Sequence, residues 1–140
     1  MIYLDTSVVV PLLVPESKTV DVKAWFASLG SIPVSGDWLL TEFASAVSIK
    51  VRRNELSESD AKAIRSEFDL LATAGLRIVP VSRSAYQDAA KMAAQHVHGL
   101  RAGDALHLAI AQEIGAQSLA TLDGVMASNA QRLKMKVEVI

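Results

Sequence analysis

Short hydrophobic runs alternate along the chain with longer segments in which hydrophobic residues recur every three or four positions. The short runs are typical of buried β-strands, and the three- and four-residue recurrence is typical of amphipathic helices. Strands are expected at residues 2–4, 32–34, 77–81, 118–122 and 137–140. Helices are expected at residues 6–13, 17–29, 37–53, 57–74, 82–98 and 101–114, with a short helix after residue 124.

This alternation predicts a single α/β domain that spans residues 1–140. Parallel strands need crossover connections, and helices supply them on both faces of the sheet. In an open parallel sheet, ligands bind beyond the carboxyl ends of the strands. Acidic residues that follow strands are therefore the first candidates for a functional site.

The composition predicts a folded protein without a strong overall charge. Hydrophobic residues make up 51% of the chain and charged residues 21%, so the chain can bury a large core and is not expected to be disordered. The formal net charge is −1, so any site for a polyanion must be local. The absence of cysteine excludes disulfides, a thiolate zinc site and a cysteine nucleophile.

No segment has the features of an export signal or a membrane span. The first residues lack the basic region and long apolar core of a signal peptide, and no apolar run reaches the roughly 18 residues of a candidate transmembrane helix. We therefore expect a cytoplasmic protein with no membrane partner.

Four acidic residues occupy positions from which they can meet at one edge of the sheet. Asp5 and Asp123 each follow a predicted strand, Asp104 opens a helix, and Glu42 precedes the inward-facing Phe43. Taken singly, each has an ordinary explanation, because Asp caps helices and forms turns and Glu commonly lies on a solvated helix face. Together, four carboxylates at one edge would repel one another unless a cation lay among them.

A hard divalent cation would remove that repulsion. Mg²⁺ takes oxygen ligands in octahedral geometry and keeps several waters, and Mn²⁺ accepts the same ligand types. A water activated by such an ion could attack a phosphodiester, so no Cys, Ser or His nucleophile is required. The acids therefore indicate phosphoryl chemistry with Mg²⁺ or Mn²⁺ as the cofactor.

Four short motifs carry a resemblance to a known family. They are Leu4-Asp5-Thr6-Ser7, Thr41-Glu42-Phe43, the stretch Gly103-Asp-Ala-Leu-His-Leu-Ala109, and Thr121-Leu-Asp123. In this order they resemble the acidic motifs of PIN-domain ribonucleases and, within that family, of VapC-type toxins of toxin–antitoxin pairs. The resemblance implies a three-layer α/β/α fold with a mainly parallel central sheet, metal-dependent endonucleolytic cleavage of RNA, and inhibition by a VapB-like antitoxin.

The resemblance also implies roles for individual acids. Asp5, Glu42 and Asp104 match the three near-invariant acids of the family, and Asp123 matches its more variable fourth. Asp5 and Asp104 are expected to contact the metal directly. Glu42 and Asp123 are expected to act directly, at a second metal position, or through water.

Residues beside the acids complete the implied site. Thr6 and Thr121 match polar positions where a hydroxyl could orient a carboxylate or a water. Met126 departs from the family pattern, in which an aromatic residue follows the fourth acid by three positions, so the packing there is an open question. His107 shares a helix face with Asp104, but Mg²⁺ prefers oxygen, so a structural role is favoured over metal binding.

RNA binding needs local positive charge, because phosphate contacts dominate the affinity. Lys50, Arg52 and Arg53 form the densest basic patch, and Arg101 stands at a predicted helix start. These four residues are the candidates for phosphate contact, although a solvated surface is the simpler explanation for any one of them.

The apolar stretch from Val8 to Val14, with Trp25 and Phe26, offers more hydrophobic surface than one core is expected to need. Exposed apolar surface commonly marks self-association or a partner site. We therefore expect a homodimer and a groove for an antitoxin helix.

Two other functions are compatible with the sequence. A haloacid-dehalogenase-like phosphatase also has an Asp after the first strand, as a covalent nucleophile, but its pattern needs a second Asp where this chain has Ser7. A non-catalytic regulatory or binding module would use the acids only as helix caps. Divalent cations should not stabilise such a module, whereas a metal site formed only in the folded state must be stabilised by its ion.

Overall fold

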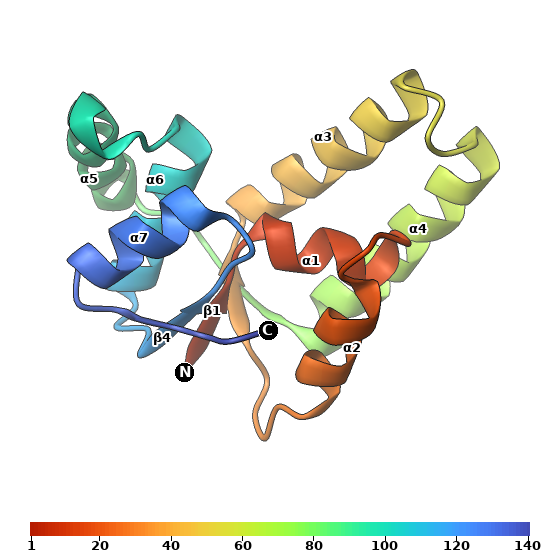
Figure 1. The fold of residues 1–140 in the computed structure, drawn as a ribbon, viewed down its shortest axis with the longest axis horizontal. Helices are drawn as coiled ribbons and strands as arrows, with labels where there is room; N and C mark the ends of the chain where they lie inside the picture. The colour runs from red at the N-terminus through yellow and green to blue at the C-terminus, as the bar shows by residue number, and fades with distance from the viewer.

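The computed structural model describes residues 1–140 and contains one five-stranded sheet in which all neighbouring strands are parallel. The strand order is β3-β2-β1-β4-β5, so β1 lies at the centre. Its neighbour β4 comes from the second half of the chain (Figure 1). The strands are β1 (Ile2–Leu4), β2 (Val34–Gly36), β3 (Arg77–Val79), β4 (Ser118–Ala120) and β5 (Lys136–Val137).

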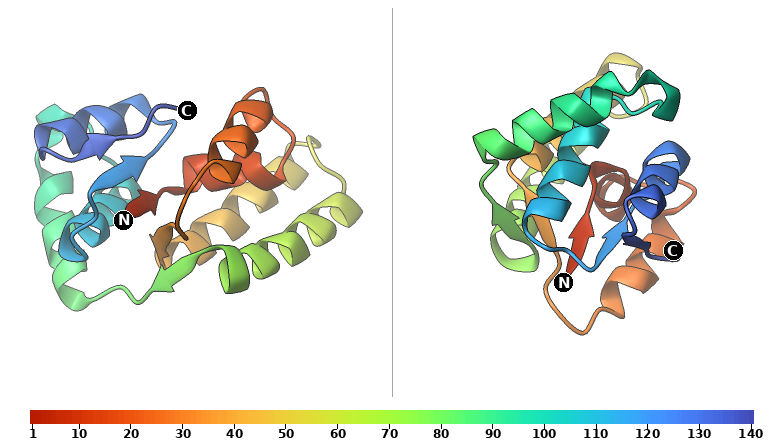
Figure 2. Two further views of the ribbon diagram at one scale, coloured as in Figure 1. Left: turned by 90° about the horizontal axis from the view of Figure 1, so that it is seen from below. Right: turned by 90° about the vertical axis from the view of Figure 1, so that its left-hand side faces the viewer.

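Helices cover both faces of the sheet and give the three-layer α/β/α arrangement that the sequence predicts (Figure 2). They are α1 (Thr6–Leu13), α2 (Thr19–Ala27), α3 (Trp38–Arg52), α4 (Glu58–Leu70), α5 (Arg83–Ala94), α6 (Ala102–Glu113) and α7 (Gly124–Arg132). A π-helical turn (Leu71–Gly75) follows α4, and a short 3-10 helix (His96–His98) follows α5. None of these helices combines the length and the apolar character needed to cross a membrane.

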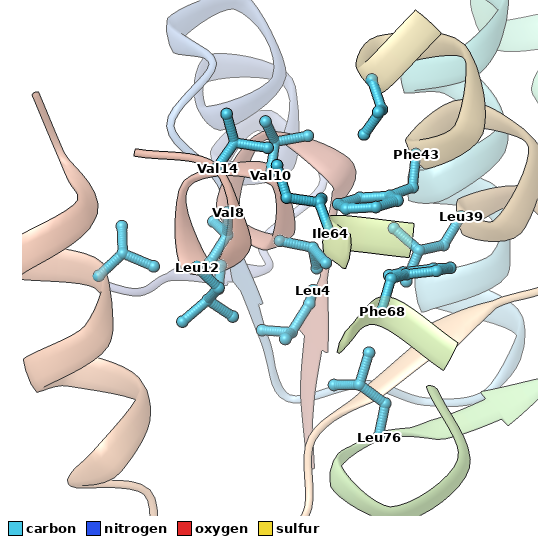
Figure 3. Close-up of a cluster of buried hydrophobic side chains, with 14 of the residues drawn as sticks. Leu4, Val8, Val10, Leu12, Val14, Leu39, Phe43, Ile64, Phe68 and Leu76 are labelled. Carbon is cyan, nitrogen blue, oxygen red and sulfur yellow. The ribbon is translucent and has the colours of Figure 1, made fainter. Parts of the chain in front are cut away.

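The helices bury one hydrophobic cluster on each face of the sheet. Side chains alternate along β1, so Tyr3 joins the cluster beneath α5, α6 and α7, and Leu4 joins the cluster beneath α1, α2, α3 and α4. In the Leu4 cluster, Phe43 of α3 stacks on Phe68 of α4 with ring centroids 4.0 Å apart (Figure 3). This contact holds α4 against the helix that carries Glu42.

The structure corrects the position of the second strand, which the sequence places at residues 32–34. The strand runs from Val34 to Gly36, and Val34 pairs with Tyr3 of β1. Pro33 has no N–H to donate to the ladder, so the strand begins after it. Three other elements are also shorter than expected: β3 and β4 end at residues 79 and 120, and α5 ends at residue 94. The helical segment that starts with α4 continues through the π-helical turn to Gly75, close to its expected end.

The apolar stretch from Val8 to Val14 lies inside the protein's own core, which corrects the expectation that it exceeds what one core needs. Apart from the partly buried Leu13, every residue of the stretch is buried. Trp25 and Phe26 are partly buried against the same cluster. This stretch therefore supplies no exposed surface for a dimer or an antitoxin.

The sheet topology places the carboxyl ends of β1 and β4 side by side. Leu4 pairs with Ala120, and the Asp5 N–H donates to the Ala120 carbonyl at 3.2 Å. The chain passes from β1 to β2 on one side and adds β4 on the other, so the strand order reverses between β1 and β4. This reversal is where open α/β sheets bind their ligands.

Candidate active site

Four acidic side chains from four different segments line one open cavity at this edge of the sheet. Asp5 follows β1, Glu42 lies on α3, Asp104 lies on α6, and Asp123 follows β4. The cavity has a volume of about 270 Å³, and its remaining walls are Thr6, Ser7, Ser45, Ala46, Ile49 and His107. The structure thus brings together all four acids that the sequence singles out.

Asp5 is held by donors on both carboxylate oxygens. It caps α1, with Oδ1 accepting the backbone N–H of Ser7, and Oδ2 accepts the hydroxyl hydrogen of Thr121. Burial raises the pKa of Asp5, although the positive charge that His107 carries when protonated and the hydrogen bonds from Ser7 and Thr121 oppose the rise. The helix-capping explanation for Asp5 is correct, but capping leaves the carboxylate in the wall of the cavity.

Glu42 is not a solvated helix residue, because only 26% of its side chain is exposed. Its Oε2 accepts the hydroxyl hydrogen of Thr6 at 2.5 Å and lies 2.7 Å from Nε2 of His107. Burial acts to raise the pKa of Glu42. The hydrogen bond from His107, the positive charge that His107 carries when protonated, and the hydrogen bond from Thr6 outweigh burial and leave this pKa below its ordinary value. Thr6 therefore orients Glu42, and not its neighbour Asp5.

Asp104 lies in the first turn of α6, whose N-cap is Arg101. The ordinary explanation of Asp104 as an N-cap therefore does not apply. Burial raises the pKa of Asp104, and the negative charges of Asp123, Asp5 and Glu42 raise it further. The four acids thus interact electrostatically, as the sequence predicts for carboxylates gathered at one edge.

Asp123 caps α7, with Oδ1 accepting the N–H of Met126 at 2.7 Å. The N–H of Asp123 donates to the hydroxyl oxygen of Thr121 at 3.0 Å, so Thr121 contacts both this acid and Asp5. Met126 is fully buried in the cluster beneath α5, α6 and α7. A methionine therefore fills the position where an aromatic residue is expected, and the turn at Asp123 forms without one.

Gly103 allows α6 to approach α3 closely. A Cβ atom at this position would collide with Oε1 of Glu42 and would lie 3.1 Å from Nε1 of Trp38. The Trp38 N–H is buried without a hydrogen bond of good geometry, yet it lies close enough to Glu42 to help lower its pKa. The absence of a side chain at Gly103 therefore permits the present separation of the two helices that carry Glu42 and Asp104.

The sequence does not reveal the contacts that two residues of the cavity, His107 and Ser7, make with distant parts of the chain. His107 is 1% exposed and contacts Tyr3 through one ring nitrogen and Glu42 through the other. The Ser7 hydroxyl accepts a backbone N–H from the segment after β4 at 2.8 Å, which ties that segment to the start of α1. The spacing from Asp104 identifies the helix face of His107, but its partner Tyr3 is 104 residues away and no local pattern reveals the contact.

The basic candidates differ in how freely they can meet a ligand. Lys50 is paired with Glu16 at 2.8 Å and with Glu55 at 3.4 Å, and its pKa is raised chiefly by the hydrogen bond to Glu16. Arg53 is exposed and lines a second hollow, about 500 Å³ in volume. This hollow shares wall residues of α1 and α3 with the acidic cavity, so the two are adjacent.

The chemistry of the acidic cavity suits a hard divalent cation, but its geometry is not preset for one. Every acid offers carboxylate oxygens, and their mutual repulsion favours a bound positive charge. No three Asp, Glu or His side chains lie at the spacing of a formed metal site. Asp5 and Glu42 instead accept hydrogen bonds from hydroxyl and N–H donors. These oxygens keep further lone pairs, so a cation could bind them once the carboxylates moved closer together.

Comparison with known proteins assigns this fold to a family. Residues 2–131 match the PIN domain, which is nearly the whole chain. The chain therefore belongs to the PIN domain family, and not to the haloacid-dehalogenase-like phosphatases that the first strand and Asp5 also suggest. No curated protein sequence gives a match.

Solved structures with the same fold include toxins. The chain is 19% identical to VapC20 of Mycobacterium tuberculosis, described as a toxin that cleaves the sarcin–ricin loop, over 92% of this chain and 95% of that one, with a TM-score of 0.74. It is 21% identical to FitAcB of Neisseria gonorrhoeae over 99% and 97% of the two chains, with a TM-score of 0.75. It is 13% identical to a chain of a toxin–antitoxin complex from Klebsiella pneumoniae over 99% and 97%, with a TM-score of 0.66. At these identities the likeness establishes the fold.

Proposed function

We propose that this chain is a Mg²⁺- or Mn²⁺-dependent endoribonuclease and the toxin of a type II toxin–antitoxin pair. The observation that carries the proposal is the meeting of Asp5, Glu42, Asp104 and Asp123 at one cavity. Membership of the PIN domain family and the likeness in fold to VapC20, a toxin described as cleaving the sarcin–ricin loop, support RNA as the substrate.

In this proposal Asp5 and Asp104 contact the cation directly, and Glu42 and Asp123 act directly, at a second metal position, or through water. A bound Mg²⁺ or Mn²⁺ supplies positive charge that lowers the pKa of water and offsets negative charge on the phosphodiester. The protein's own contribution is to hold four carboxylates together in spite of their repulsion.

Hydroxyl groups of the protein orient two of these carboxylates. Thr6 donates to Glu42, and Thr121 donates to Asp5. Without a cation, burial and the neighbouring negative charges raise the pKa of Asp104. Positive charge held among the four carboxylates would oppose this rise. The relief of this repulsion makes cation binding favourable.

The hollow that Arg53 lines is the proposed path of the RNA backbone away from the acids, because it adjoins the acidic cavity along α1 and α3. Arg53 forms no ion pair in the structure, whereas the charge of Lys50 is partly satisfied by its two acidic neighbours. Arg52 is exposed and donates to Ser48 at 3.5 Å. Arg101 is exposed at the start of α6 and is a candidate for a separate phosphate contact.

The proposed protein partners are a VapB-like antitoxin and a second copy of this chain. A neighbour in fold from Klebsiella pneumoniae is described as a toxin–antitoxin complex, which supports a partner of this kind. An RNA substrate and an antitoxin would both be met in the cytoplasm, which is the proposed location.

Cleavage of a structured RNA by the purified protein tests the proposal. We expect cleavage with Mg²⁺ or Mn²⁺, none with excess chelator, and loss of most activity in Asp5→Asn and in Asp104→Asn. The matched control is Glu67→Gln, because Glu67 is an exposed acid of α4 far from the cavity walls, and this variant should cleave like the wild type. Full activity in chelator, or unchanged cleavage in either Asp variant, would contradict the proposal.

Thermal unfolding distinguishes the nuclease from a non-catalytic module. A cation that binds only the folded state raises the melting temperature as its concentration exceeds its dissociation constant. We expect Mg²⁺ or Mn²⁺ to raise the melting temperature of the wild type and to raise that of Asp104→Asn less. A melting temperature of the wild type that does not respond to either ion would favour the non-catalytic module.

A further inference from the structure

A buried chain of hydrogen bonds runs from the middle of the sheet to Glu42. The hydroxyl of Tyr3 lies 2.8 Å from Nδ1 of His107, and Nε2 of His107 lies 2.7 Å from Oε2 of Glu42. The two rings meet edge to face with centroids 5.7 Å apart. Tyr3 is fully buried and His107 is 1% exposed, so water has little access to these contacts.

One arrangement of donors joins the whole chain of contacts to Glu42. The phenol oxygen of Tyr3 accepts the backbone N–H of Gly36 at 3.2 Å and also meets the Ser35 side chain. Its own hydroxyl hydrogen is then available to Nδ1 of His107. A neutral imidazole that accepts at Nδ1 carries its hydrogen on Nε2, and that hydrogen is donated to Glu42. Burial also raises the pKa of Tyr3, which keeps the phenol protonated.

Both ring nitrogens of His107 are occupied by these contacts. Nδ1 faces Tyr3, and Nε2 faces Glu42 and lies 3.1 Å from the Thr6 hydroxyl. His107 therefore has no free nitrogen for a metal ion in this arrangement. The sequence favours a structural role for His107 over metal binding. The structure connects that role to one acid of the cavity, because Nε2 of His107 contacts Glu42.

We propose that Tyr3 and His107 are positioning residues that hold the carboxylate of Glu42 for catalysis. Tyr3 lies in a hydrophobic cluster with Leu106, Leu108 and Ile110. Apolar side chains could fill the space of Tyr3 and His107 equally well, and they would need no hydrogen-bond partner. Burying a phenol and an imidazole costs free energy unless each is hydrogen-bonded, so the pair is costly as mere packing. The proposal rests on the proposed nuclease function, in which Glu42 is one of the four acids.

Removal of a single hydroxyl tests the role of Tyr3. Tyr3→Phe preserves the ring but removes the donor that holds Nδ1 of His107. We expect kcat for RNA cleavage to fall by about threefold to tenfold, the scale of one hydrogen bond, with KM unchanged. The matched control is Tyr86→Phe, because Tyr86 is the only other tyrosine and is 52% exposed on α5. Equal activity in Tyr3→Phe and wild type would overturn the proposal.

Two substitutions of His107 distinguish a role in positioning Glu42 from a role in filling space. The amide of His107→Gln can donate to Glu42 in place of Nε2, whereas His107→Leu fills the space without a donor. We expect His107→Gln to retain more of kcat than His107→Leu, with both folded by thermal unfolding. If His107→Leu is poorly folded, a kcat of His107→Gln that equals or exceeds that of Tyr3→Phe still supports the role of the Nε2 donor, and a much lower kcat contradicts it. Equal kcat of Leu and Gln variants that are both folded would overturn it.

The tautomer of His107 provides a readout that needs no enzyme activity. Long-range ¹H–¹⁵N NMR spectra of the imidazole should show the wild-type hydrogen on Nε2, and Tyr3→Phe should lose this single tautomer. A hydrogen on Nδ1 in the wild type would overturn the positioning role while leaving the nuclease proposal intact. Absence of RNA cleavage by the wild type with either ion would overturn the proposed function, and with it the catalytic purpose of the hydrogen-bond chain.

Discussion

Thr121 donates its hydroxyl hydrogen to the carboxylate of Asp5, a residue 116 positions earlier in the chain. The same hydroxyl oxygen accepts the N–H of Asp123 at 3.0 Å. One threonine therefore joins the acid that follows β1 to the acid that follows β4. The two-residue spacing from Thr121 to Asp123 therefore has a structural reason. It places the Thr121 hydroxyl where it can contact both Asp123, after β4, and Asp5, after β1.

Thr121→Val should move the acidic limb of the pH–activity profile to higher pH. The Thr121 hydrogen bond lowers the pKa of Asp5, so its loss leaves burial less opposed and raises that pKa. Asp5 then ionises at higher pH, and the rate at low pH falls. The pH dependence of kcat/KM measures this shift, and Thr121→Ser, which keeps the hydroxyl, should retain the wild-type profile. Coincident profiles of Thr121→Val and wild type would contradict the assignment.

Gly103→Ala should impair RNA cleavage without destabilising the fold. Alanine favours a helix over glycine by about 1 kcal/mol, but its Cβ would push Glu42 away from α6. Displacement of a catalytic group by about 1 Å can cost about a hundredfold in rate, so a loss of at least tenfold is expected. Gly30→Ala is the control, because no atom lies within 4 Å of the new Cβ there. An active Gly103→Ala enzyme would show that the approach of Glu42 is not required.

Asp104→Asn should be more stable than the wild type at neutral pH when no divalent cation is present. The pKa of Asp104 in the folded protein lies above its ordinary value of 3.8, so the folded state binds a proton more tightly than the unfolded chain. The contribution of this group to stability is present below pH 3.8 and is lost as pH rises through the raised pKa. Asparagine does not ionise, so the Asp104→Asn variant does not lose stability in this way as pH rises. Urea unfolding at several pH values in chelator measures the difference.

The difference in unfolding free energy between Asp104→Asn and wild type should therefore grow as pH rises from acid to neutral. Glu67→Gln, which changes an exposed acid of α4 that does not line the cavity, should track the wild type across the range. A difference for Asp104→Asn that stays constant with pH would show that the four acids do not repel one another as the structure indicates.

Arg53→Gln should weaken RNA binding while leaving kcat nearly unchanged. The hollow lined by Arg53 adjoins the acidic cavity, so its charge can meet a phosphate next to the cleaved one. Loss of one phosphate contact should reduce the slope of log affinity against log salt by about 0.7 for a single strand. Arg65→Gln is the control, because Arg65 is an exposed arginine of α4 that lines neither hollow. Equal KM and salt slope for both variants would remove Arg53 from the RNA path.

The fold could be predicted from the sequence because its signals are local. Strand and helix patterns alternate clearly, and Ser57 and Ser82 cap α4 and α5 as helix-favouring serines do. Element ends were harder, because they depend on neighbours. The strand near Pro33 begins one residue after the proline, where the N–H of Val34 becomes available. The burial of the Val8–Val14 stretch likewise depends on how much core α2, α3 and α4 share with α1, which no local pattern reveals.

The acids of the site were also predictable, because parallel topology alone brings Asp5 and Asp123 to one edge. The partners that hold them were less so. The sequence suggests that Thr6 could orient a carboxylate, but only the packing of α3 against α1 shows that this carboxylate belongs to Glu42. The contact of Tyr3 with His107 depends on the packing of α6 on the sheet, and so it lies beyond any spacing rule.

The four acids divide between two halves of the chain. Asp5 and Glu42 precede, and Asp104 and Asp123 follow, the exposed Pro80 in the connection between β3 and α5. The hydrophobic clusters divide in nearly the same place, since α1 to α4 build one and α5 to α7 build the other. A chain cut at this connection would give two fragments that each carry an incomplete set of acids. Under the proposed function, only their reassembly would restore cleavage, so the fold would be suited to a split reporter in which RNA scission signals that two polypeptides have met.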